Sequence, residues 1–451
     1  MVWKAFRVPR RDWLVALVLF GVTVLYLASL PPNLGPSDEA IHLYESKRIL
    51  DGEVLYRDVF EMITPGYLYL MALLFGVFGT DFATARTAQA VMHGITGVLL
   101  YAACRKLEIR RALSAAAPLA YLVISQSAWP VVSQHWLSTL FSVVVLLTCI
   151  DLPRDRARAA LLPGVALGLL ISVQQQRGAI MAAGVFVWMI VDALLARRLQ
   201  PREPSAPLTA RLACLVAGAL LIVVPVTVAI ILHAGFQPVW RALVIFPLFD
   251  YRGSTHCPWG DVNIMSYTQG TYTFPRLLKF LPVVLPVVAV RLGILAWRRR
   301  DARSALRLAL LLVLSLFSML SIFYFPDFIH IAFIAPVFYA TIAESVEWLL
   351  RAVPAPALTL RLAGRAAAVV LLVGAGYRLV HNRSRIQAAW PVVRSTAFGR
   401  IALQDQLQAE LYDRAEAVLR AVKQARSRAN DLSVDTKDRI GAAITKAVFG
   451  V

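Results

Sequence analysis

The sequence has little charge, few cysteines and no repeated unit. Only 16% of its 451 residues are charged, and 27 acidic side chains stand against 46 basic ones. No segment alternates apolar and polar residues over about ten positions, as the strands of an outer-membrane barrel do. The four cysteines show neither paired nor metal-ligand spacing: Cys104, Cys149, Cys214 and Cys257. These absences exclude a barrel, a repeat array and a disulfide framework.

Hydrophobic residues make up 59% of the sequence and are gathered into repeated uncharged runs. Runs of about 20 residues suit helices that cross a hydrocarbon layer roughly 30 Å thick. The sequence therefore predicts an all-α polytopic membrane protein. The first run exceeds the usual apolar length of a signal peptide, so an uncleaved helix is expected and a cleaved signal is the alternative. We place eleven spans near residues 13–32, 84–104, 112–126, 136–150, 159–174, 178–196, 212–232, 276–296, 307–325, 328–350 and 366–381.

The formal net charge of +19 resides mainly in the loops between these runs. Eleven spans place 23 Lys and Arg residues in the loops of one side and 6 in the loops of the other. Since short cytoplasmic loops are rich in Lys and Arg, the first side faces the cytoplasm. The charge thus indicates topology, and no nucleic-acid partner is expected. A crossing at residues 65–79 would invert the later loops, so this apolar segment is predicted to lie along the interface or to re-enter.

The arrangement divides the chain into a transmembrane module, residues 1–381, and a small helical tail, residues 382–451. Two outer loops are long, 33–83 and 234–275, and we expect function to reside there. The span count places the tail outside, whereas its 12 basic against 7 acidic residues favour the cytoplasm. Two amphipathic helices are expected in the tail, one marked by Leu403, Leu407, Leu411, Val418 and Val422 and the other by Ile440, Ile444 and Val448.

The first outer loop opens with the sequence PPNLGPSDE. Its prolines and glycine end the first span, and Ser37 can cap a new helix that begins at Asp38 and Glu39. On such a helix Asp38, His42 and Glu45 share one face. Carboxylates in a first turn can also serve only to complement the helix dipole. The residues alone leave both interpretations open.

An ordered set of motifs in residues 10–110 resembles the N-terminal module of GT-C fold glycosyltransferases, particularly bacterial relatives of the protein O-mannosyltransferase and aminoarabinose transferase families. The likeness is carried by Asp38 with Glu39, by Gly52, Tyr56, Asp58 and Phe60, by Pro65 with Phe78 and Gly79, and by Arg86. The segments QQQRG at 174–178 and YFPDFIHIAFIAP at 324–336 are similar to family positions at outer span ends. The mannosyltransferases have a His-Pro-Pro segment where this chain has MITPG, so the acceptor cannot be carried over from them.

The resemblance implies a GT-C-type bundle with interfacial helices in its first outer loop. It also implies transfer of a sugar, with inversion, from a polyprenyl-phosphate donor to an acceptor hydroxyl of a lipid, glycan or protein. The site would lie on the outer face of the bacterial cytoplasmic membrane. A general base must take the hydroxyl proton, and cationic groups must hold the departing phosphate.

Each of these roles has candidate residues on the outer side. Asp38 is the first candidate for the base, with Glu39 and Glu61 as further catalytic carboxylates. The phosphate-binding candidates are Arg177, Arg86 and His330, for which snorkelling to the interface is the alternative. Candidate substrate-binding residues are His135, Tyr56 and Asp327. No cofactor is required, but a divalent cation stays open, since His42 with Asp38, or His256 with Cys257 and Asp261, offer ligands without a recognised spacing.

The rival interpretation is a membrane transporter or lipid flippase. Such proteins often have repeated halves and broken or polar spans at mid-membrane. This chain shows no corresponding halves and few mid-span charges, and its polar groups concentrate at one membrane face. That distribution suits an interfacial enzyme. A third interpretation, a noncatalytic membrane scaffold, leaves the loop carboxylates and Arg177 unexplained.

Overall fold

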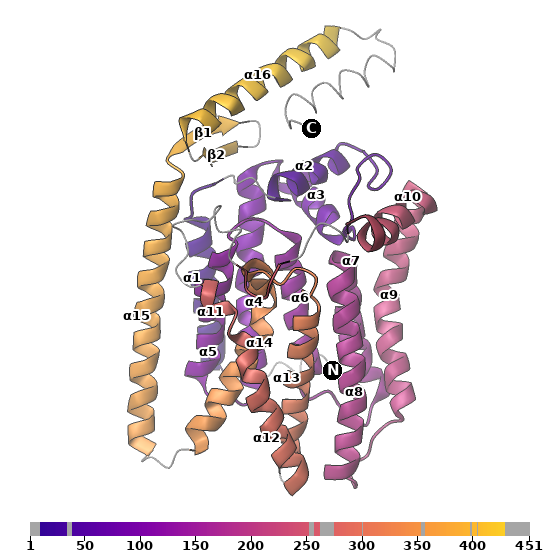
Figure 1. Ribbon diagram of the computed structural model, residues 1–451, viewed down its shortest axis with the longest axis vertical. Helices are drawn as coiled ribbons and strands as arrows, with labels where there is room; N and C mark the ends of the chain where they lie inside the picture. Colours follow the sequence, from indigo (N-terminus) through magenta and orange to yellow (C-terminus); the bar gives the residue numbers. More distant parts are fainter. Residues whose placement is uncertain are drawn as a thin grey trace.

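The computed structural model of the protein describes residues 10–33, 38–251, 257–261, 275–299, 301–352, 357–396, 399–403 and 405–428. These residues form a bundle of helices that stand side by side, with short helices and one β-hairpin at one end (Figure 1). We refer to that end, which carries α2 and is uppermost in Figure 1, as the α2 end.

The elements follow one another along the chain with short connections. In order they are α1 (Arg10–Ala28), α2 (Asp38–Leu50), α3 (Gly66–Phe78), α4 (Phe82–Lys106), α5 (Arg111–Ala120), α6 (Gln134–Cys149), α7 (Leu161–Val173), α8 (Gln175–Leu199), α9 (Leu208–Ala234), α10 (Phe236–Trp240), α11 (Pro275–Leu278), α12 (Val284–Arg298), α13 (Ala302–Leu320), α14 (Phe328–Ala352), α15 (Ala357–Ala389), β1 (Val392–Thr396), β2 (Gly399–Leu403) and α16 (Gln406–Arg428). Two π-helical segments, Tyr121–Ser125 and Arg241–Asp250, extend α5 and α10.

The helices agree with a multi-pass membrane protein. Within the described ranges, seven are long and apolar enough to cross a membrane: Arg11–Ala28, Phe82–Lys106, Gln175–Leu199, Leu208–Ala234, Leu281–Arg298, Ala302–Leu320 and Phe328–Ala352. Three further expected spans coincide with the shorter apolar helices Arg111–Ser125, Gln134–Cys149 and Ala157–Val173. The eleventh expected span, 366–381, lies within α15. The all-α membrane fold is thus confirmed, while the count of eleven stays a prediction. The segment expected at the interface forms α3, which lies beside α2 at the α2 end (Figure 1).

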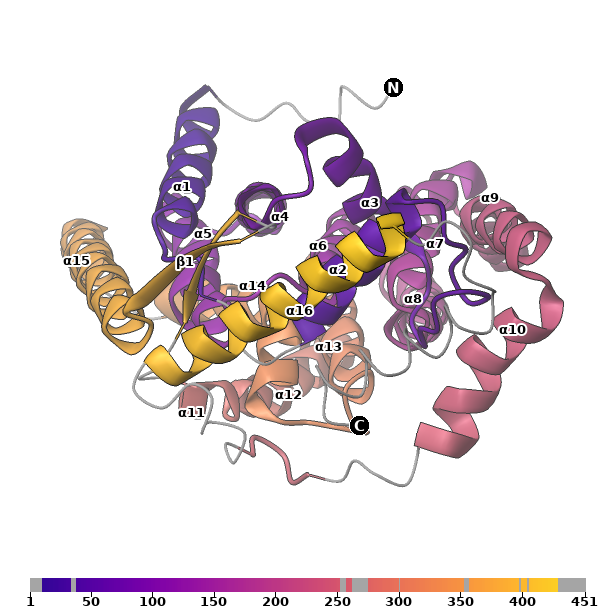
Figure 2. The same cartoon turned by 90° about the horizontal axis from the view of Figure 1, so that it is seen from above.

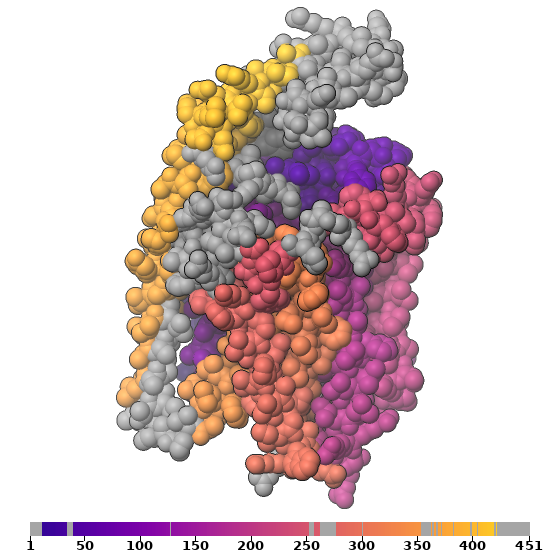
Figure 3. Space-filling view, in the orientation of Figure 1, coloured from indigo at the N-terminus to yellow at the C-terminus, as the bar shows by residue number. Residues whose placement is uncertain are grey.

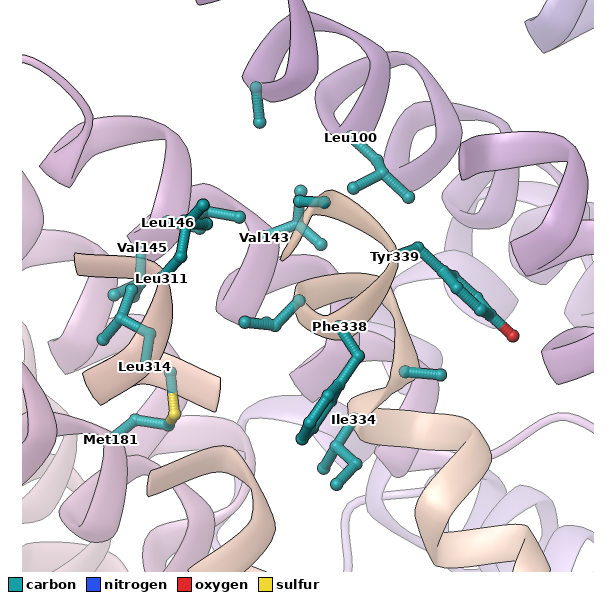
Figure 4. Close-up of a cluster of buried hydrophobic side chains, with 14 of the residues drawn as sticks. Leu100, Val143, Val145, Leu146, Met181, Leu311, Leu314, Ile334, Phe338 and Tyr339 are labelled. Atoms are coloured by element: carbon teal, nitrogen blue, oxygen red, sulfur yellow. The ribbon is translucent and has the colours of Figure 1, made fainter. Parts of the chain in front are cut away.

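The core lies where α4, α6, α8, α13 and α14 meet. Figure 4 shows side chains from these helices interdigitating, and the following are fully buried: Leu100, Val143, Val145, Leu146, Met181, Leu311, Leu314, Ile334 and Phe338. Lipid tails are as apolar as these side chains, so close packing rather than exclusion from water aligns the helices. In the space-filling view, α15 and α9 form the two opposite edges of the bundle (Figure 3).

Glycines let α7 and α9 approach closely. A Cβ atom on Gly164 of α7 would overlap the backbone oxygen of Leu215, and one on Gly218 of α9 would overlap the backbone oxygen of Leu161. Small residues at such crossings bring two backbones into van der Waals contact, which is a main source of helix association in a membrane. The Leu161–Val173 helix, although only 13 residues long, is therefore held firmly against a longer neighbour.

The C-terminal tail differs from the all-helical expectation. Helix α15 runs to Ala389, past the expected limit at 381, and an antiparallel hairpin of β1 and β2 follows it. Leu403 therefore belongs to a strand, whereas Leu407, Leu411 and Val418 belong to α16, as expected. The second expected helix, Ile440 to Val448, lies outside the described residues. Five-residue strands carry too short an alternation to stand out beside the helical pattern that follows.

The hairpin docks at the α2 end. The Ala402 N–H donates to the Pro32 carbonyl oxygen at 2.6 Å. Gly399 adopts a φ of 83°, and a Cβ atom there would overlap the Asp81 carboxylate. The tail thus contacts both the segment that leads toward α2 and the start of α4, and seen from above α16 extends from the hairpin across this end (Figure 2).

Candidate active site

Helix α2 opens with the acidic pair that the sequence singles out. Asp38 is its first residue, and the side chain of Asp38 lies outside the described residues. Acidic residues in a first turn complement the partial positive charge of a helix N-terminus. The basic residues Lys47 and Arg48 occupy the last turn, where the opposite charge is favoured. The side-chain charges at both ends of α2 therefore complement the helix dipole.

Glu39 is a buried anchor between α2 and the bundle. Its side chain is 1% exposed, and its two carboxylate oxygens accept from the Arg86 guanidinium at 2.9 Å and from the Val132 N–H at 2.7 Å. Burial raises the pKa of Glu39 to about 7, although the charge of Arg86 opposes that rise. Because both oxygens are engaged, the geometry favours positioning of α2 rather than proton transfer as the task of Glu39.

Arg86 is equally committed to the protein. Besides Glu39 it donates to the backbone oxygens of Asn33, at 2.9 Å, and Pro130. Its guanidinium also lies 4.8 Å from the ring centroid of Phe82. Arg86 thus joins the chain before α2, the start of α4 and the segment before α6. These contacts account for the position of Arg86 without a bound phosphate. A direct contact between Arg86 and the donor phosphate therefore stays a prediction.

A second buried cluster joins α2 to the loop that precedes α3. His42 Nε2 lies 3.3 Å from Glu61 Oε2, and the other oxygen of Glu61 accepts from the Met62 N–H at 2.6 Å and the Ile63 N–H at 3.3 Å. Burial alone would raise the pKa of Glu61. The hydrogen bond and charge of His42, with a hydrogen bond from Glu45, offset this effect and hold the pKa below its ordinary value. These three side chains are the described group that could hold a metal ion.

Tyr56 stabilises this loop through a hydrogen bond inside it. Its side chain is 5% exposed, and its hydroxyl donates to the Ile63 carbonyl oxygen at 2.7 Å. The residue has a φ of 70°, which is uncommon for a residue with a side chain and marks a tight turn. Since the hydroxyl is already paired inside the protein, the structure assigns Tyr56 to the shape of the loop. Its expected contact with substrate stays a prediction.

Arg177 lies at the junction of α6, α8 and α14. It is 2% exposed and donates to Ser138 Oγ at 2.8 Å, Thr139 Oγ1 at 3.3 Å and the Phe333 carbonyl oxygen at 2.7 Å. Its hydrogen-bond partners among the described residues are hydroxyl and carbonyl oxygens rather than carboxylates, and its Nε has no hydrogen-bond partner there. Burying an ionisable group without a counter-ion is costly, so Arg177 is a candidate functional residue.

Two histidines and an aspartate lie beside Arg177. The rings of His135 and His330 are 5.2 Å apart, and His135 stacks on Phe333 with centroids 4.6 Å apart. Asp327 is 1% exposed and accepts from His330 Nδ1 at 2.6 Å and from the His330 N–H at 2.8 Å. This pairing places the proton of a neutral His330 on Nδ1, so that Nε2 is its second functional atom. The predicted residues His135, His330 and Asp327 are thus brought together.

The junction between α7 and α8 connects the residues around His135 with the loop that precedes α3. Gln174 Nε2 lies 3.0 Å from His135 Nδ1, while the next residue, Gln175, donates to the Met62 carbonyl oxygen at 2.6 Å and accepts from the Thr64 N–H at 3.1 Å. Sequence reasoning noted the segment QQQRG but assigned a role only to its arginine. The unbroken run of three glutamines between two apolar helices was the available signal, because amide side chains are uncommon at membrane depth.

A cavity of about 490 Å³ lies away from this site, at the opposite end of the bundle. Its lining includes Asp151, Arg154, Asp192 and Arg307, which pair with one another: Arg154 with Asp192 at 2.7 Å and Arg307 with Asp151 at 2.9 Å. These loops are the ones expected in the cytoplasm. These two pairs compensate their charges within the cavity wall, and we place the candidate site at the α2 end.

The bundle has the GT-C fold of a membrane protein. Comparison with solved structures finds the aminoarabinose transferase ArnT from Cupriavidus metallidurans bound to undecaprenyl phosphate, with a TM-score of 0.51 and 16% identity over 83% of this chain and 74% of that one. The apo state of the same ArnT gives 0.49, also at 16% identity, over 82% of this chain and 74% of that one. The mycobacterial arabinofuranosyltransferase AftD gives 0.44 at 19% identity, over 84% of this chain but 27% of that one. The fold follows from the first of these structures.

No family model matches the sequence, and comparison with curated proteins gives no significant match. The structural likeness to ArnT therefore confirms the expected fold, while the chemistry has to be argued from the residues of this chain.

Proposed function

We propose that the protein is a glycosyltransferase that moves a sugar from a polyprenyl-phosphate-linked donor to an acceptor hydroxyl of a lipid, glycan or protein. We place the reaction on the outer face of the bacterial cytoplasmic membrane, since the α2 end carries the loops with few basic residues. The observation that carries the proposal is Arg177, a buried guanidinium with no carboxylate partner among the described residues. A phosphate is the ligand that such a guanidinium fits best.

The proposed donor agrees with the fold and with the composition of the site. ArnT, whose fold this chain shares, is solved bound to undecaprenyl phosphate. A lipid-borne donor presents its phosphate at the membrane surface, and the candidate phosphate-binding residues Arg177 and His330 lie at the α2 end. Nucleotide sugars are charged, soluble molecules of the cytoplasm, which the proposed topology places on the far side of the membrane.

The reaction itself is an inverting displacement at the anomeric carbon. The acceptor oxygen forms a bond to that carbon as the bond to the phosphate oxygen breaks, and the electron pair leaves on the carrier phosphate. Asp38, at the start of α2, takes the proton of the acceptor hydroxyl. Arg177 and His330 offset the charge that develops on the phosphate. Glu39 and Arg86 fix the start of α2 and so position the base.

The supporting residues hold these groups in place. Asp327 orients His330 through two hydrogen bonds. Gln174 orients His135, whose ring stacks on Phe333 and borders the same region as a contact for the donor or acceptor. Preorganised groups of this kind stabilise developing charge without reorienting during the reaction.

Substitution of Arg177 tests the proposal. We expect Arg177→Ala to reduce transfer from a synthetic polyprenyl-phosphate sugar more than Arg177→Lys, because lysine keeps the charge and loses only the planar fork. Arg241→Ala, an exposed arginine in the second long loop, is the matched control and should leave transfer unchanged. Thermal unfolding of each purified variant separates loss of chemistry from loss of the α6, α8 and α14 junction. Equal transfer by Arg177→Ala and wild type would refute the assignment.

A further inference from the structure

His42, Glu45 and Glu61 form a buried cluster to which the proposed chemistry assigns no task. The three side chains are 5%, 7% and 8% exposed. Each offers one ligand atom, an imidazole nitrogen or a carboxylate oxygen, and these atoms lie within 4.8 Å of one another. Two carboxylates and an imidazole rarely gather inside a protein unless something compensates their charge.

The arrangement of the three residues is that of a metal site. His42 and Glu45 are three positions apart on α2, so both side chains leave the same face of the helix. The same spacing supplies paired ligands in carboxylate-rich metal sites of helix bundles. Glu61 adds a third ligand from a loop on the other side of the cluster. An imidazole with two carboxylates suits a divalent cation of borderline hardness, such as Mn²⁺ or Zn²⁺.

The surroundings of the cluster support this interpretation. One oxygen of Glu61 is held by the N–H groups of Met62 and Ile63, which turns the other toward His42. Hydrogen bonds of this kind orient the ligands of metal sites. The Tyr67 ring meets the His42 ring edge-on at 5.9 Å. The Tyr67 hydroxyl and His42 Nδ1 are both buried without a hydrogen-bond partner among the described residues. Such buried orphan atoms are rare and indicate an additional ligand.

The carboxyl groups of Glu45 and Glu61 also need a positive charge between them. Their ligand atoms lie within 4.8 Å of each other, where two carboxylates repel. A divalent cation bound between them would offset both negative charges. It would also tie α2 to the loop before α3.

We propose that His42, Glu45 and Glu61 bind one divalent cation, Mn²⁺ or Zn²⁺, at the α2 end. Three protein ligands leave coordination positions open, as in catalytic metal sites. A phosphate oxygen of the donor suits such a position. This use of the cation rests on the proposed function, whereas the site itself rests only on the three ligands and their surroundings.

Binding of Mn²⁺ to the full-length protein in detergent tests the site. The protein is stripped with EDTA and dialysed, and Mn²⁺ is then titrated while the electron paramagnetic resonance signal of the free ion is recorded. We expect one saturable ion for each chain, displaced by Zn²⁺. His42→Gln and Glu45→Gln should each weaken binding at least about tenfold. Asp51→Asn, an exposed carboxylate just beyond α2, is the control and should bind as the wild type does.

The outcomes separate the site from its use. No saturable binding of Mn²⁺ or Zn²⁺ to the wild type, or unchanged affinity in both ligand variants, would overturn the proposal. A melting temperature that falls with EDTA and recovers with Mn²⁺ in the wild type alone supports the site even if a ligand variant folds poorly. If Mn²⁺ binds as expected but sugar transfer is insensitive to EDTA, the site stands and its role toward phosphate fails. If no sugar is transferred at all, the proposed function fails independently.

Discussion

Replacement of Glu39 by Gln should remove a pH dependence from the stability of the protein. Burial raises the pKa of Glu39 from 4.5 to about 7 in the folded state. Between these values the folded protein binds a proton that the unfolded chain has lost. Stability from this residue is therefore fully present below pH 4.5 and is lost as the pH rises toward 7.

The magnitude follows from the two pKa values. At about 1.4 kcal/mol for each pH unit, the interval from 4.5 to about 7 corresponds to about 3 kcal/mol in the free energy of unfolding. Gln resembles the protonated carboxyl group and can still accept from the Val132 N–H. The free energy of unfolding of the variant should therefore not fall in this way as the pH rises. We expect the wild type to be less stable relative to Glu39→Gln at pH 8 than at pH 5.

The buried thiols of Cys104 and Cys149 provide the assay. Their reaction with a fluorogenic maleimide reports unfolding in detergent on heating, at pH values from 5 to 8. Glu53→Gln is the control, because Glu53 is a partly exposed partner of Arg48 at the same end, where a surface pair contributes only about 0–1 kcal/mol. The quantity compared is the stability of the wild type relative to Glu39→Gln. If this difference were constant with pH, or grew in favour of the wild type as the pH rises, the raised pKa of Glu39 would be contradicted.

Three further predictions concern the base, the topology and the tail. Asp38→Asn should reduce turnover by about 10² to 10⁴ fold with little change in donor binding, measured as kcat and KM; near wild-type turnover would move the base to another carboxylate. In a background without native cysteines, Asp51→Cys should react with an impermeant thiol reagent in spheroplasts and Ser205→Cys should not, and the reverse labelling would invert the topology. Gly399→Ala should lower the melting temperature, because its φ of 83° and the nearby Asp81 carboxylate both disfavour a Cβ atom; an unchanged melting temperature would mean that the hairpin does not hold the α2 end.

The membrane-spanning part of the fold was predictable because it depends on local signals. Apolar runs and the placement of Arg and Lys are read directly from the sequence, and the helices follow them. The hairpin was not predictable in the same way. Strands β1 and β2 have five residues each, and their stability depends on docking against Pro32 and Asp81, which are over 300 positions away in the sequence.

The sequence indicates which residues of the candidate site lie at the same end of the bundle, but not how they pair. The sequence predicts Glu39, Glu61, Arg177 and His330 at one membrane face, and in the structure these residues lie at the α2 end. That Glu39 pairs with Arg86, 47 positions away, and His42 with Glu61 depends on how the loop 53–64 folds back over α2. Composition carries no information about such contacts. Carboxylates therefore looked equivalent in the sequence although their environments differ.

The same reasoning explains why Tyr56 was expected to contact substrate. Its place in a motif is visible in the sequence, but its positive φ and its hydrogen bond to Ile63 are not. Arg177 stands out in the sequence, because an arginine beside a long apolar run requires a partner wherever it lies. Its three helix-bridging hydrogen bonds appear only in the structure.

The central claim is that the sugar donor is linked to a polyprenyl phosphate, and one transfer assay tests it most directly. Purified wild-type protein in detergent is given synthetic polyprenyl-phosphate hexoses and pentoses, with lipid, glycan and protein acceptor fractions, and nucleotide sugars serve as comparison donors. We expect mass spectrometry to find a new glycosidic bond with a lipid-linked donor and none with a nucleotide sugar alone. Transfer from the nucleotide sugar alone would contradict the claim, as would translocation of the carrier across liposomes with no glycosidic bond formed.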